Sequence, residues 1–421
     1  MRKRLDLLAF LVFSYRVLFA DTITVMQYNL MYYDKVYSDC NTTNNNVDAK
    51  DGYLRTILNY VKPDILTVNE VNDAISSVER IKTNTLNYGG ETRYKRANFS
   101  GSFLVNMIYY NSEKIELKSQ EAIPTSPRET NVYKLYLKTP GLVNGDTVFL
   151  YHFVTHLKAG SYDSDAQQRA AAASAIMSYI ASKDIKGNII LSGDMNLYNA
   201  SEGAFVAFTT PTGSSNFRFY DPLNAIGNWH ADYSYRYFHT QSTRTVANEG
   251  CFSTGGLDDR FDFILASSDI LSGSRGIKFY SYKTLGQDGN RFNESITSPT
   301  NTSVPPDLAN ALYSMSDHLP VIMKVTYSPG STLVKTEKNP INILFNNPVY
   351  NTLTLQVFEN ENVTIVSVNI FNILGNFILS VKPQSLDQKV DIDLSGIPSG
   401  VLLVEVKLND GRQRTLKIIK K

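Results

Sequence analysis

Short β-type runs that end in a polar side chain recur along this chain, with helical segments between them. The polar residues that end or follow these runs include Asn29, Glu70, His156 and Asp194. Strands separated by helices favour a layered α/β domain, and side chains at strand ends belong to the edge where loops carry function. The pattern therefore predicts an α/β domain whose site lies along the ends of its strands.

The spacing of apolar residues distinguishes helices from strands in this domain. Apolar residues recur at helical spacing over 54–61 until Pro63 stops the pattern, and the Ala-rich segment 166–182 predicts a second helix. We expect a polar loop over 38–50. The predicted strands are Ile23–Leu30, Ile65–Val68, Phe103–Tyr110, Thr147–Thr155, Asn188–Leu191 and Phe261–Ala266.

The first residues have the form of an export signal. The sequence MRKR precedes an apolar run over 7–20, which is too short to span a bilayer comfortably. We predict a signal peptide at 1–20, with a buried first helix as the alternative. The two cysteines, Cys40 and Cys251, are too few for a four-thiolate zinc site. In an exported protein they form a disulfide or remain two buried thiols, and the sequence leaves both open.

The character of the chain changes near residue 327. Its 421 residues suffice for two or three domains. Pro, Gly, Ser and Lys mark a linker at 328–340, which separates a first domain at 21–327 from a tail at 341–421. Short alternating runs divided by turn signals predict that the tail is a small β-sandwich. It contains no His or Cys, so we place the chemistry in the first domain.

The charge balance limits how this protein could hold a polyanion. The whole chain has a formal net charge of +1, but the excess of basic over acidic residues lies near the two ends and the part between them is slightly acidic. An acidic domain has no general electrostatic attraction for nucleic acid. Any phosphate would be held locally, by a metal ion and a few basic side chains.

The polar residues at the strand ends form a set suited to phosphate ester chemistry. Carboxylate and amide oxygens are hard ligands for Mg²⁺, Mn²⁺ or Ca²⁺, and a His beside a carboxylate has a fixed tautomer and basicity. Singly, these motifs are ordinary; GDMN, for example, also suits a turn. Together they supply ligands for a metal ion, an oriented base and amide hydrogen-bond donors. These are the groups needed for attack of water on the phosphorus of a phosphate ester. The set is Asn29, Glu70, His156, Asp194, Asn196, Asp262, Asp317 and His318.

In this order, the set resembles the motifs of the endonuclease/exonuclease/phosphatase superfamily over residues 22–327. That superfamily includes pancreatic-type deoxyribonucleases and bacterial sphingomyelinases. The resemblance implies a four-layer α/β sandwich, in which two packed β-sheets are flanked by helices and the site lies at one rim. It also implies that Asn29 and Glu70 hold the divalent metal, with Asp317 as a further ligand, while Asp194 and Asn196 orient the nucleophilic water and the phosphate.

The same resemblance assigns roles to the remaining members of the set. Asp262 would polarise His318, which would act as general base or bind phosphate, and Arg260 would brace Asp262. His156 would contact the scissile phosphate or assist the leaving group. Whether Asp194 or His318 takes the proton stays open at this point.

The tail resembles the C-terminal sorting domain of the type IX secretion system. The matching features are the NPV motif at 347–349, DLSGIPSG at 393–400 and the basic end KIIKK. The resemblance implies handling by the type IX machinery through residues 341–421 and a secreted or cell-surface protein of a Bacteroidetes-like Gram-negative bacterium. The alternative is a carbohydrate-binding or adhesive β-domain.

These observations predict a secreted, monomeric phosphodiesterase that uses Mg²⁺, Mn²⁺ or Ca²⁺, with extracellular DNA or RNA as its expected substrate. A sphingomyelinase-like enzyme acting on phospholipid is the alternative, because the aromatic run Trp229–Phe238 could form a lipid-binding hairpin. A surface protein that binds without catalysis is the third hypothesis. The sequence leaves the choice among DNA, RNA and lipid open, together with endo or exo action.

Overall fold

The structure is a computed structural model that describes residues 21–139, 141–142, 146–211, 216–327, 341–358, 362–372, 376–383 and 387–421. The predicted signal peptide at 1–20 and the linker at 328–340 lie outside the described residues. Within these ranges, no helix has the length and apolar character needed to cross a membrane.

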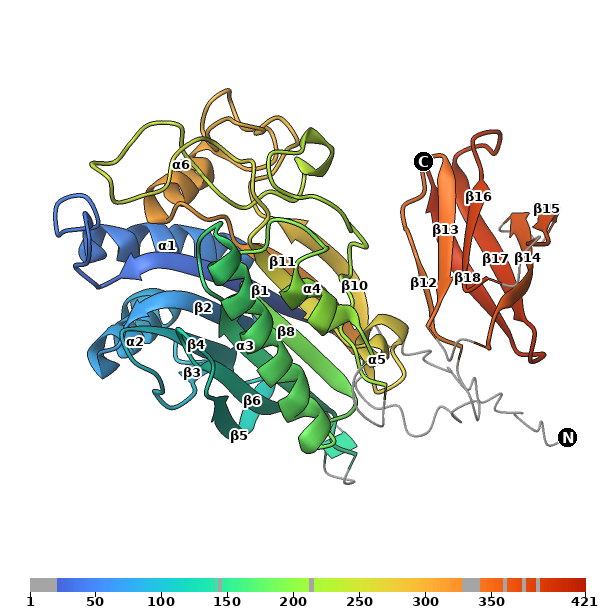
Figure 1. The fold of residues 1–421 in the computed structure, drawn as a ribbon, viewed down its shortest axis with the longest axis horizontal. Coiled ribbons are helices and arrows are strands. Elements are labelled where there is room, and N and C mark those ends of the chain that lie inside the picture. The colour runs from blue at the N-terminus through green and yellow to red at the C-terminus, as the bar shows by residue number, and fades with distance from the viewer. Residues whose placement is uncertain are drawn as a thin grey trace, which may run out of the picture.

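Two β-sheets form the first domain (Figure 1). The six-stranded sheet has the order β10 (Ile277–Thr284), β11 (Val321–Tyr327), β1 (Asp21–Tyr33), β2 (Ile65–Asn72), β4 (Leu104–Asn111) and β3 (Tyr94–Arg96). The five-stranded sheet has the order β5 (Ile115–Ile123), β6 (Thr130–Leu137), β7 (Phe149–His156), β8 (Asn188–Asp194) and β9 (Asp262–Ala266). Both sheets are mixed, and each contains one parallel pair that bears on the site: β1 with β2, and β7 with β8.

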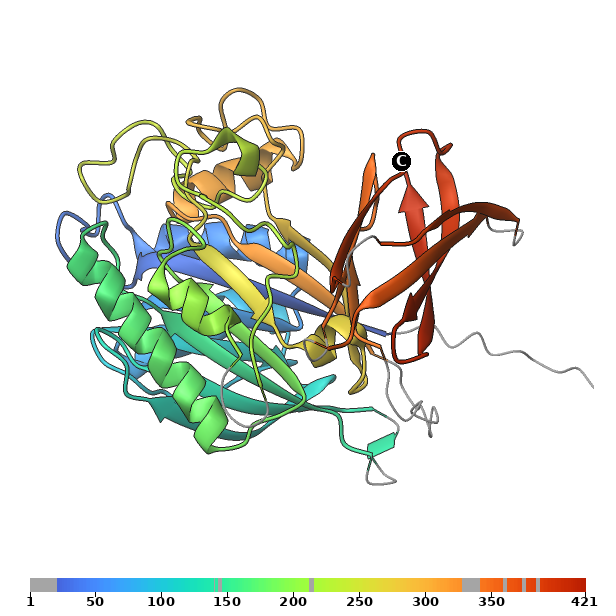
Figure 2. The ribbon, with the colours of Figure 1, turned by 45° about the vertical axis from the view of Figure 1, so that its right-hand side comes forward.

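Helices cover the outer faces of the two sheets (Figures 1 and 2). The six-stranded sheet is flanked by α1 (Val47–Val61), α2 (Ile75–Ile81) and α6 (Pro306–Met315). The five-stranded sheet is flanked by α3 (Asp163–Ser182) and α4 (Gly203–Thr209), while α5 (Ser268–Ser272) follows β9. The four layers predicted from the sequence are confirmed.

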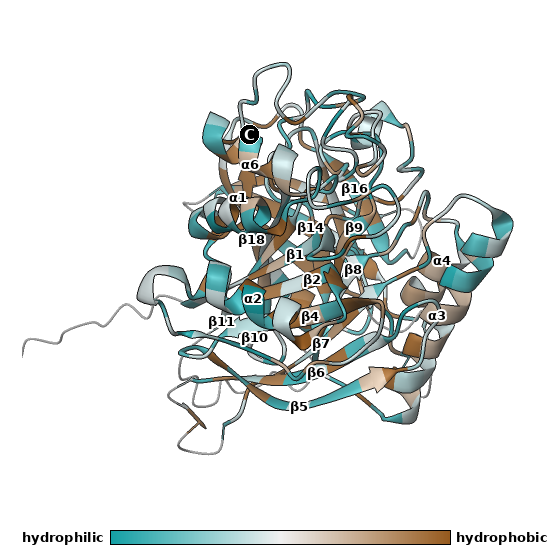
Figure 3. Ribbon diagram, turned by 90° about the vertical axis from the view of Figure 1, so that its left-hand side faces the viewer, coloured by the Kyte–Doolittle hydropathy of each residue, from teal (hydrophilic) through white to brown (hydrophobic). Residues whose placement is uncertain are grey.

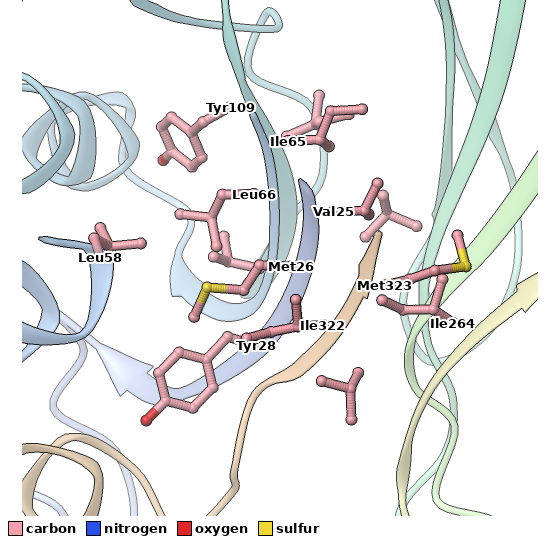
Figure 4. Close-up of a cluster of buried hydrophobic side chains, with 14 of the residues drawn as sticks. Val25, Met26, Tyr28, Leu58, Ile65, Leu66, Tyr109, Ile264, Ile322 and Met323 are labelled. Carbon is pink, nitrogen blue, oxygen red and sulfur yellow. The ribbon is translucent and has the colours of Figure 1, made fainter. Parts of the chain in front are cut away.

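Alternation along the strands divides the core into an inner and an outer part. Figure 4 shows Val25 and Ile65 on the side of the six-stranded sheet that meets Ile264 of the other sheet, while Met26 and Leu66 point toward the helix that carries Leu58. All five of these residues from the strands are fully buried. Figure 3 shows the same division at the scale of the domain, with hydrophobic strands inside and hydrophilic loops around them.

The tail forms two antiparallel sheets around its own apolar core, drawn in orange to red in Figure 1. One sheet contains β12 (Ile343–Phe345), β13 (Thr352–Val357) and β16 (Lys389–Asp393). The other contains β15 (Phe377–Val381), β14 (Ile365–Asn372), β17 (Gly400–Leu408) and β18 (Gln413–Lys420). The predicted β-rich tail is therefore confirmed.

The structure corrects the expected loop over 38–50 and decides the state of the two cysteines. The polar loop expected over 38–50 ends early, because the Asn46 side chain accepts a hydrogen bond from the Ala49 amide at 2.9 Å and α1 begins at Val47. Cys40 and Cys251, left open above, form a disulfide. This bond joins the loop after β1 to a loop 211 residues further along the chain.

Candidate active site

Asn29 links the two sheets at the rim where β1, β2 and β8 end. Its side-chain amide donates to Glu70 Oε1 at 3.1 Å and to Asp194 Oδ2 at 2.9 Å. The parallel pairing of β1 with β2 puts Asn29 beside Asn69, and that of β7 with β8 puts His156 beside Asp194. Because the carboxyl ends of parallel strands share an edge, four residues distant in sequence meet in one place.

Glu70, His156 and Asp194 form a cluster that could hold a metal ion. One ligand atom from each lies within 4.8 Å of the others, and His156 Nε2 is 3.7 Å from Glu70 Oε1 and 3.4 Å from Asp194 Oδ2. Two carboxylates and an imidazole are a donor set that suits a divalent cation, while Asn29 directs its side-chain NH₂ at the two carboxylates and its carbonyl oxygen at the Met31 amide. The residues present therefore fit the metal that the sequence predicts.

His318 and Asp262 form a buried pair at the same rim. His318 Nδ1 lies 2.7 Å from Asp262 Oδ2, and His318 Nε2 lies 3.7 Å from Asp194 Oδ2. Burial disfavours the imidazolium, but the carboxylates of Asp262 and Asp194 outweigh burial and raise the pKa of His318 well above its usual value. Nδ1 of this ring is held by Asp262, and its second nitrogen faces the cluster.

Burial also changes the protonation of the other members. It raises the pKa of Asp194 to about 7, against the opposing charge of His318 and with the help of Asp262 and Glu70. Burial, Arg128 and His318 hold the pKa of His156 well below its usual value. His156 is therefore a neutral imidazole, the form that binds a metal.

Asp317 lies at this rim but outside the cluster of Glu70, His156 and Asp194. Its Oδ2 accepts from the Ser253 amide at 3.0 Å and from Gln241 Nε2 at 3.3 Å. Gln241 Nε2 also lies 2.8 Å from His318 Nε2. Gln241 therefore connects Asp317 with His318. The sequence did not single out Gln241, because nothing in its position distinguishes it from other loop residues.

A polar network between the sheets holds Asp194 in position. Asn69 Oδ1 accepts from the Asp194 amide at 2.9 Å and from Gln27 Nε2 at 2.6 Å, and all three residues are buried. Glu70 and Asn196 adopt left-handed backbone conformations with φ of 59° and 49°. Non-glycine residues in this region are uncommon and are typical of functional sites. The backbone N–H of Asn196 donates to Asp194 Oδ1 at 3.1 Å, which places Asn196 beside the cluster.

Two expectations about residues around the site need correction. Arg260 does not brace Asp262: its guanidinium forms a two-pronged pair with Asp221, at 2.8 and 2.9 Å. The run 229–238 forms no hairpin, because Trp229 is fully buried in the core and residues 233–235 make a 3₁₀ turn. Tyr233 and Tyr237 alone of this run's large aromatic side chains are well exposed.

Comparison with known proteins assigns the tail. Residues 344–421 match the family described as the secretion system C-terminal sorting domain, which confirms the predicted type IX sorting domain and a secreted or cell-surface location. No curated protein matches the chain.

Several solved structures resemble the first domain at low identity. A humanized Danio rerio TDP2 is 17% identical, with 72% of this chain and 98% of that chain covered and a TM-score of 0.45. An endonuclease/exonuclease/phosphatase family protein from Bacteroides thetaiotaomicron is 14% identical, with 73% and 99% covered and a TM-score of 0.44. The human Nocturnin catalytic domain has the same identity and TM-score, with 73% and 98% covered.

Proposed function

We propose that this protein, which carries a secretion sorting domain, is a divalent-metal-dependent phosphodiesterase that cleaves extracellular nucleic acid. The observation that carries the proposal is the convergence of a metal-binding donor set with a buried, carboxylate-paired histidine. Glu70, His156 and Asp194 supply the first, and His318 with Asp262 supplies the second. This combination suits the hydrolysis of a phosphate ester, whose transition state gathers negative charge on the phosphoryl oxygens.

Each residue has a task in this proposal. Glu70, His156 and Asp194 would hold the metal, which when bound would polarise the phosphate and lower the pKa of water, and Asn29 orients the two carboxylates through its side-chain NH₂. Asn196 presents its amide side chain to the phosphate or to the attacking water.

His318 directs Nε2 toward the cluster, where it binds a phosphoryl oxygen or takes a proton from the attacking water, and Asp262 orients the ring through Nδ1. Gln241 and Asp317 act on His318 from the opposite side, so they are positioning residues. In this role Asp317 does not serve as a metal ligand.

The test is a cleavage assay with the purified full-length chain. We expect nicking of plasmid DNA or cutting of RNA with Mg²⁺ and none with EDTA. Glu70→Gln, His318→Ala and Asp262→Asn should each lower kcat by about 10²- to 10⁴-fold. Glu121→Gln changes an exposed carboxylate that pairs with Lys183. This matched control should keep full activity.

The same assay includes sphingomyelin vesicles and an inositol phosphate. Release of phosphocholine without nucleic acid cleavage would redirect the proposal to a phospholipid phosphodiesterase. Full nuclease activity in Glu70→Gln or in His318→Ala would refute the proposed site.

A further inference from the structure

Three aromatic rings form a continuous row beside the candidate active site. The ring centroids of Tyr32 and Tyr37 are 5.4 Å apart, and those of Tyr37 and Phe103 are 4.8 Å apart. The side chains of Tyr37 and Phe103 are 44% and 43% exposed, a large fraction for aromatic residues, which usually pack inside. We call Tyr32, Tyr37 and Phe103 the aromatic ledge.

The aromatic ledge begins at a predicted metal ligand. The Tyr32 backbone N–H donates to Glu70 Oε2 at 3.2 Å. The charge of Glu70 raises the pKa of the Tyr32 hydroxyl, and that of Arg128 lowers it, so both charges lie near this ring. Arg128 itself donates to the Leu157 carbonyl at 3.3 Å, next to His156. A molecule on the aromatic ledge is therefore adjacent to whatever occupies the phosphate site.

The aromatic ledge is held rigidly by charged and covalent contacts. Asp73 accepts from Lys35 Nζ at 2.8 Å and from the Phe103 amide at 2.9 Å. Phe103 adopts a left-handed backbone with φ of 65°, which is rare for a bulky residue and marks a conformation that its surroundings impose. On the inner side, Tyr32 packs against the cluster around the Cys40–Cys251 disulfide. Exposed rings fixed in this way are preorganised for binding.

We propose that the aromatic ledge is a stacking subsite for an unpaired nucleobase next to the phosphate that is cleaved. This inference rests on the proposed nuclease function and narrows it to single-stranded or frayed substrates. A base offers its π-face to an aromatic side chain when it is free of its duplex neighbours, and such stacking is independent of sequence.

Charge around the aromatic ledge favours a nucleic acid over a membrane. Lys35 Nζ lies 4.9 Å from the Phe103 ring centroid and forms an ion pair with Asp73, so both charges would be desolvated if the rings entered acyl chains. In a nucleic acid complex the same ammonium stays in water and faces the phosphate that follows the stacked base.

The test measures binding with fluorescein-labelled oligomers of equal length and charge, one octathymidylate and one built from baseless tetrahydrofuran residues. The protein is the full chain with His318→Ala and Mg²⁺, so that binding is observed without cleavage. We expect tighter binding of octathymidylate than of the baseless oligomer. The double variant Tyr37→Ala/Phe103→Ala should weaken octathymidylate binding by about 5- to 100-fold and leave the baseless oligomer unaffected.

Controls separate the aromatic ledge from general surface effects. Tyr350→Ala removes a more exposed aromatic ring, 62% accessible, from the sorting domain and should change neither affinity. Unchanged octathymidylate binding in the double variant would overturn the inference while leaving the nuclease function standing. Loss of binding to sphingomyelin vesicles instead of octathymidylate would also overturn it, in favour of a membrane contact. Failure of the wild-type chain to cleave any nucleic acid would refute the proposed function itself.

Discussion

Lys50 illustrates how one buried residue supports the site from behind. It lies on α1 with 1% exposure, and its ammonium donates to the Leu30 carbonyl at 2.8 Å and to the Met31 carbonyl. Burial lowers the pKa of Lys50 to about 7, against the charges of Asp317 and Glu70. Through these two carbonyls, Lys50 fixes the turn that connects Asn29 with the aromatic ledge.

We expect Lys50→Met to cost about 1–3 kcal/mol of unfolding free energy, because the Leu30 carbonyl loses its Lys50 donor and the Met31 carbonyl keeps only the Asn45 side chain, at 3.4 Å. It should also lower nuclease activity, since the turn after Asn29 is released. Chemical denaturation and a cleavage assay measure the two effects. Lys118→Met, at an exposed position on β5, is the matched control and should be neutral. Wild-type stability in Lys50→Met would contradict this role.

At the scale of elements, the close approach of β7 and β8 brings His156 and Asp194 together. Gly193 pairs with Thr155 across these strands, and a Cβ at Gly193 would lie 1.8 Å from the Thr155 carbonyl oxygen. No larger residue fits without moving a strand. The glycine in the GDMN motif therefore serves strand packing directly beside the site.

Gly193→Ala should lower the free energy of unfolding by about 3 kcal/mol or more, because the strands must separate. Thermal unfolding measures the loss. Gly52→Ala is the control, for which we expect no loss of stability. Gly52 lies within α1, and a Cβ added there would meet only the end of the Arg55 side chain, at 3.7 Å. That variant should be neutral or stabilising by up to about 1 kcal/mol. Equal melting temperatures for Gly193→Ala and the wild type would show that the strands adapt.

The Cys40–Cys251 disulfide acts at the same scale, because it joins two loops that border the site. One loop carries Tyr37, and the other carries Ser253, whose amide bonds Asp317. The double variant Cys40→Ser/Cys251→Ser should lose about 2–5 kcal/mol of unfolding free energy. A reductant should lower the melting temperature of the wild type and leave that of the variant unchanged. Equal sensitivity of both proteins to the reductant would contradict the prediction.

At the scale of the whole molecule, buried histidines make the fold sensitive to acid. His152 lies between the sheets with Nε2 2.8 Å from Ser192 Oγ, and burial lowers its pKa to about 3. Burial likewise lowers the pKa of His239 to about 4. Below the unfolded-state pKa of about 6.5, the unfolded chain binds protons that the native chain does not, so stability falls as the pH falls.

We therefore expect His152 alone to lower the free energy of unfolding by about 2 kcal/mol between pH 7 and pH 5, a loss that the raised pKa values of Asp194 and His318 partly offset in the wild type. His152→Asn should show a correspondingly smaller difference between the two pH values, whatever its stability at pH 7. Urea denaturation at both pH values measures this difference. An identical pH dependence in the two proteins would remove His152 as the cause.

Much of this architecture was predictable from local patterns in the sequence. The periods of 2 and 3.6 residues identified the main strands and α1, because burial of one face imposes that period on any element. In the tail, the turn-forming residues Gly, Pro, Asn and Asp marked where one strand ends and the next begins. The edge strands β5 and β10 were not predicted, since their faces are partly exposed and their patterns are mixed. The strand β11, which lies between β10 and β1 and is largely buried, was also not predicted.

The sequence by itself determined which chemical groups are available and that they stand at strand ends, because residue type and local period are properties of neighbouring residues. The tertiary structure alone decided which of them touch. It brought His156 into the cluster with Glu70 and Asp194, placed Gln241 between Asp317 and His318, and joined Cys40 to Cys251. These contacts depend on how two sheets pack and how long loops return, and no local pattern encodes such distances.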